Sequence, residues 1–436
     1  MIGFVLLIRP PWMSVVCLLT AGLMGASAEP GGLNRKGPLA ALPSTPGETI
    51  AKFKTLGDNE WLVLGTPADD PKWGRARGRS WSCAMAFAPD LHGAFLFGEG
   101  VHGWWNQKTG RYMDDLWFFD VPGHRWICVY PGTEVKAYRQ AFTEDGFEAD
   151  ADGRPAPVAS MVHSYEMVTY DTDARRFLSM PCPGGYWNAI EGRKSFLEQQ
   201  KDKLNRSHAS PWMYDTVEGR WDRRTTKSAS PGSGFGDTLV YIAPHKKVFF
   251  YGPGHGVYYY DPTANDWADV RAKGPPPPFG IDSPCCYDPK RDRICLGGGS
   301  YPLVKGDNAL WIWDVKAGSW VDPKPKGKPC NGSNSYATNI AAMHYDSAND
   351  AVLVFRHTGN AQECGVFAYD PQHNQWTTAG KLPERWPRGQ VNAFYDPLLN
   401  VHLFHVAGDS QDNGVIVAYR YRRVTKGVKS SLSPDN

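Results

Sequence analysis

The stretch "LWFFDVPGHRW", Leu116–Trp126, joins an aromatic run to a turn and a tryptophan. The aromatic run is typical of a buried strand. Asp120 ends the run and begins a turn, because an aspartate side chain can accept a hydrogen bond from its own backbone two residues on. Trp126 then opens the next strand, where its large side chain fills space between neighbouring sheets. The stretch therefore predicts a two-stranded hairpin.

The same spacing recurs along the chain. An aspartate that ends an aromatic run is again followed six residues later by a tryptophan at Asp215/Trp221, Asp261/Trp267, Asp314/Trp320 and Asp370/Trp376. Self-similarity of this kind indicates a repeat architecture in which each repeat is one structural unit. The repeat, together with 46 Gly and 35 Pro, predicts many short strands joined by turns.

A second hairpin precedes each of these units and has its own pattern of strand, polar turn and strand. There are six such first hairpins, from "FAPDLHGAFLFG" to "FYDPLLNVHLFHV", but only five that carry the Asp–Trp pair. The sixth unit ends in "GVIVAYRYRR" without a tryptophan, whereas "DNEWLVLGTP", from Asp58, carries Trp61 and resembles "HRWICVYPGT". We expect this N-terminal strand to complete the last sheet, because closing the ring removes exposed sheet edges.

The Asp-bounded aromatic strand, the tryptophan six residues later and the Gly297-Gly298 pair that ends one hairpin resemble the kelch repeat. The resemblance implies an all-β fold, a β-propeller of four-stranded blades, and the unit count gives six blades. It covers the chain from Asp58 to Arg423, so we assign residues 58–424 to the propeller. We expect residues 29–57 to be a flexible segment and residues 425–436 a disordered tail.

Composition narrows the class of partner. The 436 residues include 47 Lys and Arg against 45 Asp and Glu, a nearly neutral balance that predicts neither nucleic-acid binding nor an electrostatic membrane anchor. No segment beyond the N-terminal region reaches about 18 consecutive apolar residues, so we expect no membrane span. The oligomeric state is left open.

The N-terminus has the pattern of an export signal. Arg9 precedes an apolar run from Met13 to Met24, and Ala26-Ser27-Ala28 matches a small-residue cleavage site. We expect residues 1–28 to be a signal peptide and the mature protein to be secreted or periplasmic. Translation starts at Met1 or at Met13.

Eight cysteines follow the expected cleavage site, and disulfides form in exported proteins. Cys285 and Cys286 precede a turn and Cys295 follows it, so one of the pair is expected to bridge Cys295 across a hairpin. The cysteine spacing does not match a zinc ribbon or finger. We therefore predict no metal site and no cofactor.

Candidate binding residues gather at one end of the predicted blades. The four strands of an up-and-down blade are lettered a to d from the inside. The a–b and c–d turns then lie on one face of the propeller, and the b–c and d–a connections lie on the other. The a–b and c–d turns are short and polar. The b–c and d–a connections carry the candidate ligand-binding residues Arg77, Trp81, Trp104, Trp105, Trp187, Arg193, His255, Tyr301, Arg356 and His357, and the candidate catalytic residues His102, His163, Tyr165 and Tyr186.

Loop residues commonly carry function, and a set of histidines and an arginine recurring on one rim favours a binding role over packing alone. The alternative is that the aromatic residues, among them Trp105 and Trp187, wedge the blades apart. The b–c loop from Gly184 to Pro211 has helical composition and five cations, including Arg193. Cations on this rim favour a carboxylated or sulfated ligand.

Three functions fit these residues. The first is carbohydrate binding, most simply of an acidic polysaccharide, with flat aromatic faces against sugar C–H groups and polar side chains that orient the ligand. The second is a polysaccharide lyase, which cleaves a uronate-containing glycan by β-elimination. It needs a base, an acid and a cation, roles that suit His163 or His102, Tyr186 or Tyr165, and Arg193 or Arg77.

The third function is a protein-interaction scaffold outside the cytoplasm, since kelch proteins inside cells commonly act as scaffolds. Copper oxidation of the galactose-oxidase type is disfavoured. That family uses an adjacent Tyr-His pair as copper ligands, and the sequence contains no Tyr-His dipeptide. Fold alone does not choose among these functions.

Overall fold

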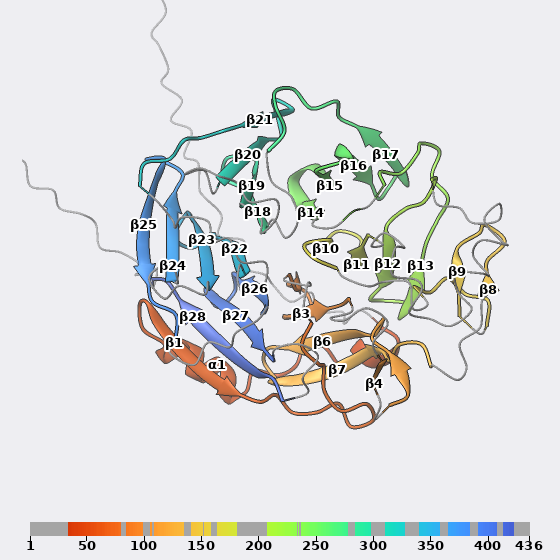
Figure 1. The fold of residues 1–436 in the computed structure, drawn as a ribbon. Coiled ribbons are helices and arrows are strands. Elements are labelled where there is room, and N and C mark those ends of the chain that lie inside the picture. Colours follow the sequence, from red (N-terminus) through yellow and green to blue (C-terminus); the bar gives the residue numbers. More distant parts are fainter. Residues whose placement is uncertain are drawn as a thin grey trace, which may run out of the picture. The chain divides into compact units, whose positions relative to one another are not determined.

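Six antiparallel sheets of four strands form a ring in the described part of the chain (Figure 1). The computed structural model describes residues 34–79, 84–98, 105–106, 109–134, 141–150, 152–157, 164–180, 207–232, 234, 237–277, 284–297, 310–327, 340–357, 365–383, 391–407 and 413–422. Chain contacts divide the protein into two units, residues 1–34 and 35–436, and every strand belongs to the second. The expected signal peptide and C-terminal tail lie outside the described residues.

The first three blades follow the chain from the inside outwards. Blade 1 comprises β2 (Ala86–Ala88), β3 (Gly93–Leu96), β6 (Leu116–Asp120) and β7 (Arg125–Tyr130). Blade 2 comprises β10 (Val168–Asp171), β11 (Arg176–Ser179), β12 (Trp212–Asp215) and β13 (Arg220–Asp222). Blade 3 comprises β14 (Thr238–Ile242), β15 (Lys247–Gly252), β16 (Gly256–Asp261) and β17 (Asp266–Asp269).

Blades 4 and 5 have the same order. Blade 4 comprises β18 (Cys285–Asp288), β19 (Arg293–Gly297), β20 (Leu310–Asp314) and β21 (Ser319–Val321). Blade 5 comprises β22 (Ile340–Asp346), β23 (Ala351–His357), β24 (Gly365–Asp370) and β25 (Gln375–Gly380). Two short hairpins lie outside the blades, β4 (Trp105–Asn106) with β5 (Arg111–Tyr112) and β8 (Ala141–Phe142) with β9 (Glu148–Ala149).

The N-terminal strand closes the ring, which confirms the prediction from the unit count. Blade 6 comprises β26 (Asn392–Asp396), β27 (Val401–Val406), β28 (Val415–Arg420) and, as its outermost strand, β1 (Glu60–Gly65). Strand β1 runs antiparallel to β28, and Trp61 lies opposite Tyr419. The first and last strands of the propeller thus share one sheet, and the ring has no open blade.

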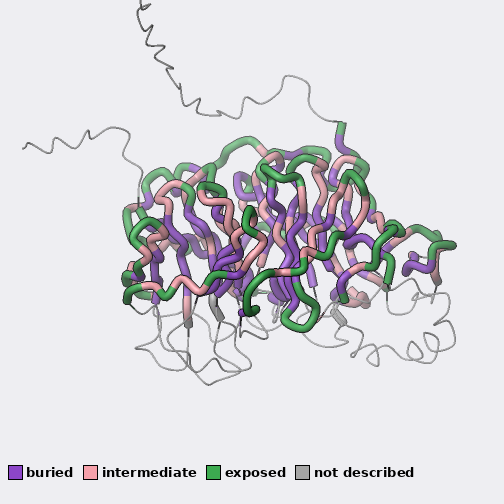
Figure 2. Tube along the Cα trace, turned by 90° about the horizontal axis from the view of Figure 1, so that it is seen from above, coloured by how far each residue is buried: buried purple, intermediate pink, exposed green. Residues whose placement is uncertain are grey.

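The tryptophans of the repeat lie between blades, as predicted. Trp126 packs in a cluster with Phe394 and Leu403 of blade 6, and Trp221 packs with Phe95 of blade 1. The other tryptophans of the repeat, Trp267, Trp320 and Trp376, are also buried against the blade that precedes their own. Trp61 takes the equivalent place in the cluster between blades 5 and 6. Figure 2 shows the buried strands beneath exposed turns.

Residues just before two of the inner strands bond to the inner strands of neighbouring blades. The backbone N–H of Met85 donates to the carbonyl of Ala393 at 2.9 Å, and that of Leu239 donates to the carbonyl of Glu166 at 2.9 Å. These bonds join blade 1 to blade 6 and blade 2 to blade 3. They hold the inner strands around a common axis, where a pocket lies (below).

Residues 34–57 are structured, which differs from the flexible segment expected there. A 3₁₀ turn, η1 (Gly37–Leu39), and a helix, α1 (Glu48–Thr55), occupy this stretch, and the Phe53 side chain is buried. Arg420, at the end of β28, donates from Nη1 to the carbonyls of Phe53 at 2.8 Å and Leu56 at 2.6 Å. The segment is therefore tied to blade 6 by a buried guanidinium.

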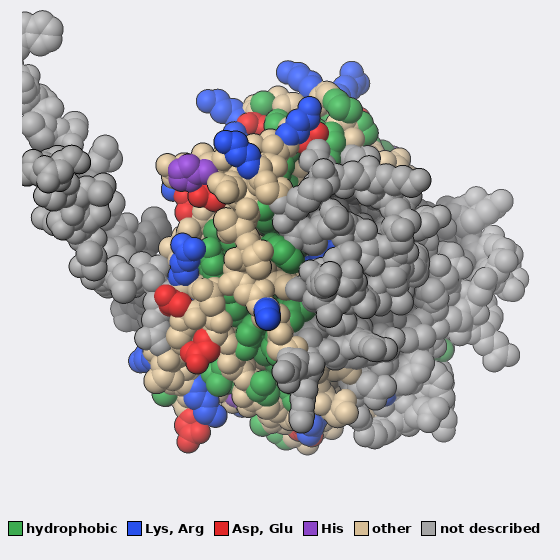
Figure 3. Space-filling model, turned by 60° about the vertical axis from the view of Figure 1, so that its left-hand side comes forward, with side chains coloured by type: hydrophobic (Ala, Val, Ile, Leu, Met, Phe, Trp, Pro, Cys, Tyr) green, Lys and Arg blue, Asp and Glu red, His purple; other side chains and the backbone are tan. Residues whose placement is uncertain are grey.

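Charges of both signs are interspersed on the described part of one face of the molecule. Figure 3 shows blue and red side chains scattered over the described part of the face in view, without separation by sign. No helix among the described residues is long and apolar enough to cross a membrane.

Candidate functional site

The a–b and c–d turns form one face of the propeller, here called the turn face, and they share one construction. The aspartate that ends the strand accepts backbone N–H groups of the turn: Asp261 Oδ1 accepts from Thr263 at 2.9 Å and from Ala264 at 3.0 Å. Asp370 bonds Gln372 and His373 in the same way. The predicted role of the repeat aspartate as a turn former is confirmed in these turns.

A tyrosine just before the aspartate completes many of these turns. Its hydroxyl bonds the side chain five residues later, at 2.9 Å in Tyr287–Asp292 and 3.0 Å in Tyr369–Asn374. Asp292 and Asn374 have φ of 54° and 49°, in the left-handed region that Asn and Asp tolerate better than most residues. Since the same residues cap and close these turns, the described turn face carries structural roles.

The opposite face, here called the loop face, is where the b–c and d–a connections leave the described strands, and the sequence assigns the predicted site residues to these connections. The side chains of Arg77, Tyr165, His255 and Arg356 are described, and Trp105 and His357 are described in their backbone only. The remaining predicted residues lie outside the described residues: Trp81, His102, Trp104, His163, Tyr186, Trp187, Arg193 and Tyr301. Their roles stay predictions.

Tyr165 is a core residue in this structure. Only 3% of it is exposed, and it packs in the cluster that contains Met167 and Leu239. Its φ is 45°, an uncommon conformation for an aromatic residue. The burial gives no support to a role for Tyr165 as a catalytic acid.

His255 lies beside a buried carboxyl group, Asp237, which directly precedes β14, the inner strand of the same blade. A Cβ placed on Gly234 would lie 3.3 Å from His255 Nε2 and 3.5 Å from Asp237 Oδ1, so both side chains reach the same glycine. Asp237 is 1% exposed and accepts a hydrogen bond from the backbone N–H of Gly234. The Asp237 carboxyl group and the His255 imidazole therefore both lie next to Gly234.

Burial sets the protonation of this pair. It raises the pKa of Asp237 to about 7, and the hydrogen bond from Gly234 opposes only part of that rise. Burial also lowers the pKa of His255 below its usual value. At neutral pH Asp237 therefore exchanges its proton readily while His255 is neutral, which is the condition for acid–base chemistry.

A stacked arginine on the loop face has no carboxylate partner among the described residues. Arg223 follows β13 at its loop-face end. Its guanidinium carbon lies 4.7 Å from the Trp212 ring centroid and 5.5 Å from that of Phe147. Burial lowers the pKa of Arg223 to about 9, so the group is still a cation at neutral pH. The next residue, Arg224, is instead paired with Asp222 at 2.7 Å.

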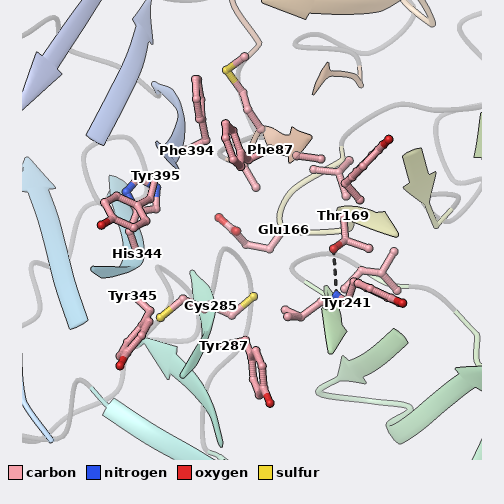
Figure 4. A pocket seen from close by; sticks show the side chains of 18 of the residues that line it. Phe87, Glu166, Thr169, Tyr241, Cys285, Tyr287, His344, Tyr345, Phe394 and Tyr395 are labelled. Atoms are coloured by element: carbon pink, nitrogen blue, oxygen red, sulfur yellow. Dashed lines mark hydrogen bonds between the residues drawn. The ribbon is translucent and has the colours of Figure 1, made fainter. Parts of the chain in front are cut away.

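A pocket of about 330 Å³, the axial pocket, lies among the inner strands of the six blades (Figure 4). Aromatic and aliphatic side chains line most of it, with Phe87 and Phe394 on one wall. Glu166, Thr169 and His344 add polar groups, and Thr169 Oγ1 accepts the backbone N–H of Tyr241 at 2.9 Å. Ligand pockets in proteins have this composition of apolar walls with few polar groups.

Cys285 and Cys286 of blade 4 line the same pocket. Cys286 lies directly opposite Cys295 in the β18–β19 pairing, and the structure has both as free thiols. Burial, the largest cause, and the nearby Cys295 raise the pKa of Cys286 well above its usual value. The predicted disulfide stays a prediction, and the register favours Cys286 over Cys285 as the partner. No group of three His, Cys, Asp or Glu side chains within the described ranges is placed to hold a metal.

No protein-family model matches this chain, and no curated protein is similar to it. Solved structures with a similar arrangement include an auxiliary nutrient binding protein from Bacteroides ovatus, at 12% identity over 83% of this chain and 75% of that one, with a TM-score of 0.44. A gluconolactonase from Xanthomonas campestris matches at 13% identity over 85% and 92%, with a TM-score of 0.41. No functional residue is carried over from either.

Sequence reasoning missed several of these groups. Arg223 gives no local signal, because Phe147, which contacts it, is 76 positions away in the chain. His344 could have been found from the sequence. It directly precedes Tyr345, and each of the other five inner strands has a Tyr or Phe at the position of Tyr345. The residue directly before that ring is Ala, Thr, Val, Cys or Phe in those strands, and histidine only here. Aligning the six repeats position by position would have singled it out.

Proposed function

We propose that this protein is an exported β-propeller that binds an acidic carbohydrate on its loop face, with Arg223 as an anchor for a carboxylate or sulfate. The observation that carries the proposal is the Arg223 guanidinium stacked on Trp212 without a carboxylate partner among the described residues. Export rests on the N-terminal sequence pattern.

The stacking prepares Arg223 for an anion. A guanidinium offers a planar fork of N–H donors that matches a carboxylate, and packing between rings reduces the freedom lost when it binds. Its Nε is buried without a hydrogen-bond partner in the described structure. A ligand anion would supply the counter-charge that Asp222 supplies to the neighbouring Arg224.

Several other features of the loop face support a sugar as the ligand. Neutral His255 and the Asp237 carboxyl beside it can exchange hydrogen bonds with hydroxyl groups. The predicted rim residues Trp104, Trp105 and Trp187 would add flat aromatic surfaces for sugar rings.

Binding of an oligogalacturonide and of its methyl-esterified form, measured by calorimetry, tests the proposal. The two probes differ in the carboxylate charge. We expect the free acid to bind at least 10-fold more tightly to the wild-type protein, because a charge-assisted bond to a guanidinium is worth about 1.5–3 kcal/mol. Arg223→Gln should remove this preference.

Arg224→Gln is the matched control, since it removes an adjacent arginine that is already paired. It should keep the preference for the free acid, and thermal melting should show both variants folded. Equal binding of the two probes by the wild-type protein, or an unchanged preference in Arg223→Gln, would contradict the proposed anchor.

A polysaccharide lyase is the second candidate, and the Asp237–His255 pair favours it. β-Elimination requires a base that removes the C5 proton of a uronate, and a group with a pKa near the working pH is suited to that step. The ultraviolet absorbance of unsaturated uronate products, followed in wild type and in Asp237→Asn, tests it. Absence of product from oligogalacturonide, alginate and glucuronan would leave binding as the function.

A further inference from the structure

Two histidines and an aspartate lie in series between blades 5 and 6. His344 on β22 lines the axial pocket, and its Nδ1 lies 3.0 Å from Nδ1 of His402 on β27. The two rings are nearly parallel, with 6° between their planes. On the far side, His402 Nε2 lies 3.5 Å from Asp346 Oδ2, and both of these side chains are 0% exposed.

Asp346 is ionised in this arrangement. Burial alone would raise its pKa, but His402 and Asn349 outweigh burial and hold the pKa of Asp346 below its usual value. Asn349 donates to it from the backbone and from Nδ2, and Tyr395 donates its hydroxyl at 3.1 Å. The negative charge of Asp346, 3.5 Å from Nε2 of His402, favours the proton of His402 on that nitrogen over Nδ1.

The same logic then fixes His344. With its proton on Nε2, neutral His402 offers a lone pair at Nδ1, so His344 Nδ1 must carry the proton of their shared bond. Burial, followed by the other ring, lowers the pKa of His344, which keeps it neutral. Nε2 of His344 is therefore left as an acceptor, and no described side chain donates to it.

Comparison among the six repeats shows that the propeller does not need this series. In the other blades, the b-strand position of His402 is held by Ala94, Phe177, Val248, Ile294 and Val352. All five are apolar, whereas the aspartate of the turn recurs as a structural residue. Placing two neutral imidazoles in the core costs desolvation that an apolar pair would avoid.

We propose that the axial pocket is a second binding site, in which His344 Nε2 accepts a hydrogen bond from the hydroxyl of a small neutral phenol and His402 is a positioning residue. A single ring fits: benzene occupies a cavity of about 150 Å³, and this pocket measures about 330 Å³. Phe87 and Phe394 supply an aromatic wall. Glu166, which also lines the pocket, disfavours an anionic ligand.

Fluorine NMR titration with 4-fluorophenol and 4-fluoroanisole tests the site, because only the first probe can donate a hydrogen bond. We expect the wild-type protein to bind 4-fluorophenol at least 10-fold more tightly than 4-fluoroanisole. His344→Val, which introduces the residue found at this position in blade 3, should reduce the ratio to about one. His373→Val, at an exposed histidine that does not line the pocket, should leave the ratio unchanged.

His402 has its own readout, since removing it changes the protonation of His344 without touching the ligand. In nitrogen-15 NMR of histidine-labelled protein, wild-type His344 should show an unprotonated Nε2. His402→Val should shift its proton toward Nε2 and lower the probe ratio several-fold, and His402→Gln, whose amide oxygen can accept from Nδ1, should restore both.

A wild-type protein that binds both probes equally or neither probe, or an unchanged ratio in folded His344→Val, would overturn the proposal. A proton on Nε2 of wild-type His344 would overturn the assignment of His402. The result is independent of the acidic-carbohydrate proposal, because neither probe carries a charge and Arg223 is not part of the axial pocket.

Discussion

The Trp61 ring on β1 packs against the Tyr419 ring on β28, with centroids 4.6 Å apart, so the start and the end of the propeller share one contact. Trp61 also contacts Phe404 of blade 6 and Phe355 of blade 5. Its Nε1 donates to the carbonyl of Lys381 at 2.9 Å. The residue therefore joins the last blade to the blade before it as well as closing the ring.

Trp61→Ala should lower the free energy of unfolding by about 2–4 kcal/mol, because it removes a large ring from a packed interface and leaves a void. Urea unfolding followed by fluorescence measures this. Val63→Ala on the same strand is the control, since Val63 is 64% exposed and such changes alter stability by about 0.5 kcal/mol or less. Equal losses in both variants would show that the ring is not what holds the closure.

The left-handed residues of the turns give a second prediction. Asn374 has a φ of 49°, accepts the Tyr369 hydroxyl at 3.0 Å and donates to the carbonyl of Pro323 at 2.6 Å. Asn374→Ala loses both bonds and also strains the backbone, whereas Asn374→Gly loses the bonds alone. The Ala variant should therefore be less stable than the Gly variant by about 1 kcal/mol, as measured by thermal melting.

If Asn374→Ala melted above Asn374→Gly, the turn would not depend on a left-handed residue. His373, the preceding residue, provides the control. It is exposed and has an ordinary φ, so His373→Ala and His373→Gly should show the normal preference for alanine.

How much of this molecule the sequence predicts depends on whether a signal repeats. The Asp–Trp spacing occurs five times and Trp61 supplies a sixth tryptophan, so blade number and closure follow from counting. Helix α1 has no repeat and only eight residues, and it is held by Arg420, more than 360 positions away. A pattern that short cannot show on its own which distant partner buries it.

The residues of the candidate site also divide into those that the repeat predicts and those that it does not. His255 was predicted because its loop lies on a face defined by the repeat, and the structure places it beside Asp237. Arg223 stacks on Phe147 and Trp212, which lie in separate segments of the chain, so a local sequence pattern does not predict its environment. His402 stands at a position that is apolar in the other five repeats, so an alignment of the repeats predicts it as an exception.

The cysteines of blade 4 give a third prediction. Because Cys286 is directly opposite Cys295, oxidation should join these two and leave Cys285 free. Peptide mapping of the exported protein without reduction, with free thiols blocked first, identifies the pair. A Cys285–Cys295 peptide would contradict the register, and three free thiols would contradict the predicted disulfide.

Asp237 gives a prediction about pH. Its pKa in the folded protein is about 7, against a usual value of 3.8, because burial disfavours the charged form. Below about pH 4 the carboxyl is protonated in both the folded and the unfolded states. As the pH rises from about 4 to about 7, the unfolded state loses the proton first. Stability should therefore fall across this window by about 1.4 kcal/mol per pH unit, and level off above it.

Asp237→Asn cannot ionise, so it should gain stability relative to the wild-type protein as the pH rises from 4 to 7, by a total on the order of 4 kcal/mol. Urea unfolding at pH 4, 5.5, 7 and 8 measures the difference at each pH. Asp269→Asn is the control, because Asp269 belongs to the same blade and is exposed. A difference for Asp237→Asn that does not change with pH would mean that Asp237 is already ionised in the folded protein, which would remove it as an acid–base group at neutral pH.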